Sequence, residues 1–150
     1  MTEKEPTLRD VIRAFRAAPY LFRGARYVAK GRYDRALAVF DRAIELNPDH
    51  ALGFAHRGTT YFTVGRYDQA LADYDRAIEL DAADAWFFAG RGETYRAMER
   101  YDQALADLNR AIELDPTEDE FAAARTAICQ LTGRSDTDHA VPSNRGTEAT

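Results

Sequence analysis

Three histidines, one cysteine and many carboxylates are the residues of this 150-residue chain that could do chemistry. The histidines, His50, His56 and His139, fall at a predicted turn, inside a predicted helix and in a polar C-terminal segment, so they do not converge on one site. Zinc sites need Cys and His ligands at short spacings, and the single cysteine, Cys129, has no such neighbours. We therefore expect neither a metal nor another cofactor.

Paired carboxylates could act as a general acid and base, but here they fall in turns or on outer helix faces. Asp73 lies beside Asp75, and Asp81 precedes Asp84 by three residues. A catalytic site needs an acid, a base or a nucleophile that converge on one pocket, and no such set can be assembled from these positions. We expect the protein not to be an enzyme and to have no small-molecule substrate.

The stretch from Gly65 to Leu80 organises the chain, because close copies of it begin 34 residues away on each side, at Gly31 and Glu99. Each copy has a small, a large apolar and a small residue at i, i+4 and i+7, which share one face of an α-helix. They are Ala36, Phe40 and Ala43, then Ala70, Tyr74 and Ala77, then Ala104, Leu108 and Ala111. A Gly-x-x-Tyr element precedes each copy and predicts a second helix per repeat.

A 34-residue unit with aromatic, Gly, Tyr, Ala, aromatic, Ala and Pro positions in this order resembles the tetratricopeptide repeat family. The resemblance covers residues 17–118 and implies an all-α fold, a right-handed α-solenoid of three helix-turn-helix repeats with a capping helix at each end. Four residues depart from the family pattern. Arg23, Arg57 and Arg91 stand where the family usually has Leu, and Ala82 stands where repeat two should have Pro.

The resemblance divides the chain into seven segments. The N-terminal cap is expected to stop near Pro19, because proline limits a helix, and the polar C-terminal segment has too little apolar content to fold. The segments are a disordered N-terminus (1–6), an N-terminal capping helix (7–18), repeats over 17–50, 51–84 and 85–118, a C-terminal capping helix (118–133) and a disordered tail (134–150).

A glycine recurs in the middle of each predicted first helix, where Gly costs about 1 kcal/mol relative to Ala. Three copies at one repeat position need a packing reason, and close contact with the second helix supplies it. The small alanines of the second helix should approach these glycines, with the tyrosines alongside. The residues assigned to this packing are Gly24, Tyr27, Ala36, Gly58, Tyr61, Ala70, Gly92, Tyr95 and Ala104.

The concave surface that stacked first helices make in this family is the expected binding site. The angular position of each residue relative to the packed glycines selects a largely apolar groove. Trp86 and Phe62 are typical anchors for a bound peptide or helix, although both could equally pack as core under the terminal helices. The groove residues are Leu21, Val28, Leu52, Ala55, His56, Thr59, Phe62, Trp86, Ala89, Glu93 and Arg96.

The resemblance also bears on the kind of partner. One family mode grips the C-terminal carboxylate of a partner with Lys and Asn side chains, but this chain has Leu21, Ala25, His56, Trp86 and Gly90 at those places. That mode is therefore disfavoured. We expect a non-catalytic interaction module, a scaffold, adaptor or co-chaperone-like protein, that holds a protein or peptide segment with apolar anchors in its groove.

The N-terminal segment keeps two alternatives open, because residues 1–35 hold nine Lys or Arg against four acids, whereas residues 68–120 hold five Arg against fifteen acids. The predicted first helix has an apolar side beside Arg9, Arg13 and Arg16. We interpret it as a cap. The alternatives are a membrane-surface adaptor, with nucleic acid less favoured, or self-assembly through the end caps. No apolar run approaches the roughly 18 residues of a membrane helix, and a cytoplasmic protein is expected.

Overall fold

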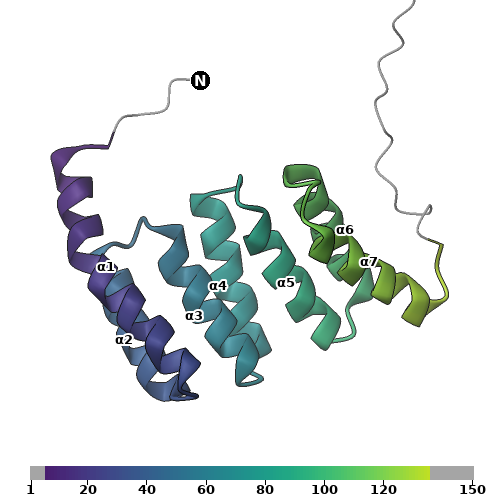
Figure 1. Ribbon diagram of the computed structural model, residues 1–150, viewed down its shortest axis with the longest axis horizontal. Helices are drawn as coiled ribbons and strands as arrows, with labels where there is room; N and C mark the ends of the chain where they lie inside the picture. Colours follow the sequence, from purple (N-terminus) through teal and green to yellow (C-terminus); the bar gives the residue numbers. More distant parts are fainter. Residues whose placement is uncertain (1–5, 136–150) are drawn as a thin grey trace, which may run out of the picture.

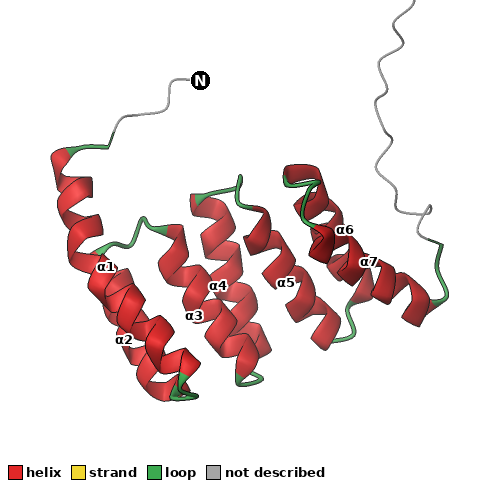
Figure 2. Cartoon of the chain, in the orientation of Figure 1, coloured by secondary structure: helices red, strands yellow, loops and turns green. Residues whose placement is uncertain are grey.

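The computed structural model describes residues 6–135, and the expected disordered segments therefore fall largely outside the described residues. The described residues form seven α-helices and no strand (Figures 1 and 2). Figure 1 shows them following one another across the molecule as a row of antiparallel pairs. The helices are α1 (Leu8–Ala29), α2 (Tyr33–Leu46), α3 (Ala51–Thr63), α4 (Tyr67–Leu80), α5 (Ala85–Ala97), α6 (Tyr101–Leu114) and α7 (Asp119–Thr132).

Each helix packs mainly on its neighbours in the sequence. The pairs α1 with α2, α3 with α4, and α5 with α6 form the repeats, and α7 packs on α6. The first helices also touch one another, since α1 contacts α3, α3 contacts α5, and α5 contacts α7. These helices therefore share one side of the molecule, and the prediction of an all-α helical solenoid is confirmed.

The two helices of each pair lie close together at the recurring glycines. A Cβ atom added to Gly58 would lie 3.4 Å from the carbonyl oxygen of Ala70, and one added to Gly92 would lie 3.3 Å from that of Ala104. Both alanines have no exposed surface. At Gly24 the nearest group is instead the ring of Phe40, which occupies the space that a side chain would need.

The turn inside each repeat needs a residue in the left-handed region. Gly31 and Gly65 supply it with φ angles of +65° and +77°. The third turn has Glu99 at the same place with a φ of +59°. A residue with a Cβ atom pays roughly 1–2 kcal/mol for this conformation, so the shared turn geometry outweighs a local cost in repeat three.

The chain does not break at Pro19, and the prediction of a separate capping helix over residues 7–18 is wrong. One continuous helix, α1, runs from Leu8 to Ala29, and its start is capped by Thr7, whose hydroxyl accepts from the N–H of Asp10. Proline removes one helical hydrogen bond, the one to the carbonyl of Phe15. Both residues are exposed, so water can satisfy that carbonyl while packing on α2 holds the helix together.

Arg91, which stands where the family usually has Leu, has a structural role. Its Nε and Nη2 atoms, on α5, donate to the two carboxylate oxygens of Asp107 on α6 at 2.8 and 2.7 Å. Its Nη1 atom donates to Asp75 on α4 at 2.6 Å. These hydrogen bonds hold the pKa of Arg91 above its ordinary value. One side chain thus ties together the two helices of its own repeat and the preceding repeat.

Arg57 repeats this arrangement one repeat earlier. It binds both oxygens of Asp73 on α4 and reaches Asp41 on α2 at 2.7 Å. The matching residue in repeat one, Arg23, has Val39 at the place of the buried carboxylate. The three-way ion pairs therefore lie at the two junctions where one repeat follows another.

The fully buried alanines set the closeness of the helices, which predicts a specific cost for a larger side chain. Ala70→Leu should lower the free energy of unfolding by roughly 1–3 kcal/mol, because an overpacked core forces the helices apart. Ala72, on the same helix but exposed, is the matched control, and Ala72→Leu should stay within about 0.5 kcal/mol. Circular dichroism melts compare the two; equal melting temperatures would contradict this packing.

Candidate functional site

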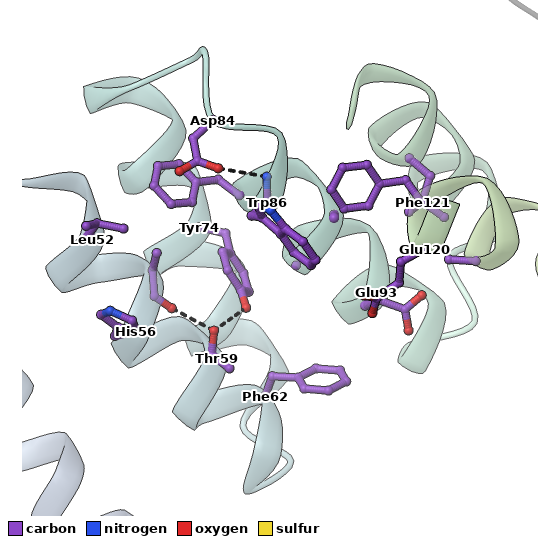
Figure 3. Close-up of a pocket in the computed structure, with 16 residues that line it drawn as sticks. Leu52, His56, Thr59, Phe62, Tyr74, Asp84, Trp86, Glu93, Glu120 and Phe121 are labelled. Atoms are coloured by element: carbon purple, nitrogen blue, oxygen red, sulfur yellow. Dashed lines mark hydrogen bonds between the residues drawn. The ribbon is translucent and has the colours of Figure 1, made fainter. Parts of the chain in front are cut away.

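A cavity of about 450 Å³ opens on the side shared by the first helices (Figure 3). Its volume falls in the ~300–1,000 Å³ range of ligand pockets. The helices α3, α5 and α7 form most of its wall, and α4 and α6 contribute to its floor. The lining residues are Leu52, Ala55, His56, Thr59, Phe62, Tyr74, Asp84, Trp86, Phe87, Ala89, Gly90, Glu93, Leu108, Glu120, Phe121 and Ala124.

Tyr74 forms the floor of the cavity by passing beneath Gly90. A Cβ atom added to Gly90 would lie 2.5–2.6 Å from the Tyr74 ring and hydroxyl, so only glycine leaves room for the tyrosine. The hydroxyls of Tyr74 and Thr59 are 2.9 Å apart, and Thr59 donates to the carbonyl of Ala55 at 3.0 Å (Figure 3). Thr59 therefore accepts from Tyr74, whose pKa is raised by burial. These hydrogen bonds join Tyr74 on α4 to α3.

Aromatic side chains form the apolar wall. Trp86 meets Phe121 edge to face with ring centroids 4.9 Å apart, and half of Trp86 remains exposed. Phe62 is half-buried beside Tyr67, whereas Phe87 is buried. Trp86 and Phe62 therefore lie at the open side of the cavity rather than in the core. They leave apolar surface available to a bound segment.

The charged side chains around the cavity are acidic. Asp84, Glu93 and Glu120 line it, and none of its described lining residues is Lys or Arg. Glu93 is neutralised by Arg96 at 2.7 Å, whereas no salt bridge in the described part of the chain involves Asp84 or Glu120. Burial, and to a smaller extent His50, lowers the pKa of His56, which is therefore neutral at pH 7. The cavity is apolar with a net negative charge.

Eight of the eleven predicted groove residues line this cavity. The three that do not are Leu21, Val28 and Arg96. Leu21 and Val28 are half-buried on α1. The cavity is lined by residues from α3 to α7 and by none from α1. Arg96 lies next to the cavity, where it forms the salt bridge to Glu93.

The sequence analysis missed the part of the cavity that α7 supplies. We predicted α7 as a cap because it lacks the Gly-x-x-Tyr element, but it occupies the place of a fourth first helix. One further 34-residue step would have found its lining residues. From Trp86, Phe87 and Gly90, this step leads to Glu120, Phe121 and Ala124.

The described residues offer no site for a metal ion, since residues 6–135 contain no group of three or more His, Cys, Asp or Glu that could hold one. Cys129 is buried at 2% exposure, and His139 lies outside the described residues. No helix within residues 6–135 is long and apolar enough to cross a membrane.

Stacked antiparallel helix pairs with an apolar cavity on one side define a helical-repeat protein. Two family models described as tetratricopeptide repeat match the chain, one over residues 24–86 and the other over residues 85–118. Together they span well over half of the sequence. The chain belongs to the tetratricopeptide repeat family, and it is a non-catalytic protein-interaction module.

Solved structures of other members share the fold. The first repeat domain of Spaghetti (RPAP3), bound to the HSP90 peptide SRMEEVD, is 23% identical with a TM-score of 0.75, covering 78% of this chain and 93% of that one. The second such domain of human RPAP3, in complex with the HSP70 peptide SGPTIEEVD, is 26% identical with a TM-score of 0.73, covering 77% and 97%. The domain of Arabidopsis OM64 is 20% identical with a TM-score of 0.74, covering 79% and 98%. No curated protein matches the sequence significantly.

Proposed function

We propose that the cavity holds an apolar, positively charged peptide or helix of a partner protein, so that the chain acts as an adaptor or scaffold. The observation that carries this proposal is the half-exposed indole of Trp86 in a cavity whose lining charges are carboxylates. Aromatic side chains in pockets are the usual anchors of protein interfaces. Asp84, whose side chain accepts a hydrogen bond from the Trp86 N–H, and Glu120 form no salt bridge among the described residues, and both carboxylates favour a cationic segment.

The same charges argue against the peptides bound by the structural neighbours. The HSP90 peptide SRMEEVD ends in a strongly acidic segment. Trp86 and Gly90, which stand at two of the positions that grip a carboxylate in one binding mode of the family, line the cavity together with Glu120. None of the described lining residues is Lys or Arg. A carboxylate-rich peptide would meet like charges, which cost affinity. The shared fold therefore supports peptide binding, while the lining supports a different class of peptide.

Peptide arrays test this chemistry directly. Amphipathic peptides with one apolar face are prepared in two matched series, one with Arg and one with Glu on the flanking positions. The protein should bind the Arg series more tightly, and Trp86→Ala should weaken that binding by about 1 kcal/mol or more, roughly fivefold, as interface anchors do. Calorimetric titration measures the affinities.

Two controls make the test specific to the cavity. Leu131→Ala removes an exposed apolar side chain outside the cavity and should leave the affinity unchanged. Glu120→Gln should weaken the Arg series alone and reduce its salt dependence. The proposal fails if both series bind equally, or if Trp86→Ala keeps full affinity with unchanged helix content.

A further inference from the structure

The start of α1 carries a second apolar surface, which the cavity does not use. The side chains of Leu8, Val11, Ile12 and Phe15 are 76%, 53%, 49% and 81% exposed. The helix α1 has 22 residues and its partner α2 has 14, so the start of α1 projects past the end of α2 (Figure 1). Four neighbouring apolar side chains without a cover mark a contact surface.

The spacing and charge of the residues on this surface are those of a helix that binds in a groove. Its four apolar residues stand at i, i+3, i+4 and i+7, the spacing with which an amphipathic helix anchors in a groove. Arg9 and Arg16 flank them, whereas Arg13 is turned to the body and paired with Asp49 at 3.3 Å. The acid in this stretch, Asp10, is held in the N-terminal cap. The surface is therefore apolar and positively charged.

We propose that this surface of α1 docks in the concave cavity of a second copy of the chain. The inference rests on the proposed function and names the segment that the cavity takes. The cavity needs an apolar cationic segment, and the start of α1 is one. In the docked pair Phe15 would face the aromatic wall at Trp86, and the flanking arginines would approach Asp84 and Glu120.

The docking must join two molecules. Within one chain α1 is packed along α2 at one end, and no residue of α1 lines the cavity. The contact is heterologous, because a helix on one copy meets a cavity on the next. A copy that docks its helix on a second copy still has its own cavity free, so the contact generates open chains or rings, of which a dimer with reciprocally exchanged helices is the smallest.

Charge favours docking of α1 in the cavity of a second copy over two other contacts of α1, with α1 of a second copy and with an anionic membrane. Pairing of α1 with α1 of a second copy would bring Arg9 and Arg16 close to their own equivalents, and like charges repel. An anionic membrane surface would also attract these arginines, but it would leave the acidic cavity empty. Docking into the cavity satisfies both surfaces at once.

A complementation experiment on the full chain tests the proposal by sedimentation velocity. The wild-type mass should rise with concentration above that of the monomer, to a dimer if two copies exchange helices and beyond it if they form larger rings or open chains. Phe15→Asp removes the helix anchor, and Trp86→Ala removes the cavity anchor, so each variant alone should associate at least tenfold more weakly. An equimolar mixture should form a heterodimer and stop there, because it contains one intact helix and one intact cavity. Glu120→Arg provides a second cavity variant if Trp86→Ala alters helix content.

Each remaining outcome overturns the proposal in a recognisable way. Self-association that survives Trp86→Ala but not Phe15→Asp would indicate pairing of α1 with α1. Wild-type protein that stays monomeric at about 1 mM, a concentration that detects even weak contacts, would reject self-docking. If that monomer binds vesicles containing an anionic phospholipid, α1 is a membrane-docking helix. If it still binds the Arg-series peptides through Trp86, the proposed function stands without this occupant.

Discussion

Replacing Arg91 with Leu, the residue usual at this place in the family, is expected to lower the free energy of unfolding by roughly 2–4 kcal/mol. Replacing Asp107 with Ala in the same chain is expected to restore most of that loss. Arg91→Leu leaves the carboxylate of Asp107 buried without the guanidinium that pairs with it, and Asp107→Ala then removes that carboxylate. A substitution toward the family pattern should therefore be harmful alone and tolerated in combination.

The expected loss follows from where the two charges lie. The side chain of Asp107 is 9% exposed and that of Arg91 is 21% exposed. Removing one partner of a buried pair costs about 3–5 kcal/mol because the other charge stays buried and unpaired, whereas replacing both with apolar groups is often nearly neutral. The partial exposure of Arg91 lets water reach the site, so we expect somewhat less than the fully buried value.

Urea unfolding at pH 7, followed by circular dichroism, measures the cycle of two single variants and the double variant. The control is Arg110→Leu, which removes a solvent-exposed i,i+3 salt bridge to Glu113 of 2.8 Å. Exposed pairs of this kind contribute only about 0.3–0.5 kcal/mol. Additive losses in the double variant would show that Arg91 and Asp107 do not act as a buried pair.

The 34-residue repeat period made most of the fold predictable. Rules about single residues, such as the rule that proline ends a helix, were less reliable. The 34-residue step located the packed glycines and alanines because each repeat buries the same residue types in the same way. Pro19 was misjudged because its effect on an isolated helix was considered alone. Packing of α1 against α2 outweighs the hydrogen bond that proline removes.

The floor of the cavity and the ion-pair network depend on contacts that the period does not encode. Gly24 receives the ring of Phe40 from its own repeat, whereas Gly90 receives Tyr74 from the preceding one. Tyr74 also meets Gly58 of its own repeat, where an added Cβ atom would lie 3.5 Å from the ring, so in repeat two the ring at this position lies closest to a glycine of the following repeat. Likewise, Arg91 was visible as a departure from the family, but its carboxylate partners could be found only from the relative placement of three helices.

Phe40→Ala is the other substitution with a large expected effect, a loss of roughly 3–5 kcal/mol in the free energy of unfolding. The ring is 1% exposed and fills the space above Gly24, so its removal leaves a cavity between α1 and α2. Phe22→Ala is the matched control, because Phe22 on α1 is 69% exposed. Its loss should stay within about 0.5 kcal/mol.

The contact between Phe40 and Gly24 predicts that Gly24→Ala lowers the free energy of unfolding in the wild-type chain and raises it in the Phe40→Ala chain. In the wild-type chain Gly24→Ala should be destabilising, because its Cβ atom would lie 2.3–2.7 Å from carbon atoms of the Phe40 ring. In the Phe40→Ala chain the ring is absent, and Gly24→Ala should stabilise by up to about 1 kcal/mol through the helix preference of alanine. Urea unfolding of all four proteins measures both effects. If Gly24→Ala changes stability equally in the two backgrounds, the glycine is not needed to admit the ring, and helix propensity alone governs this position.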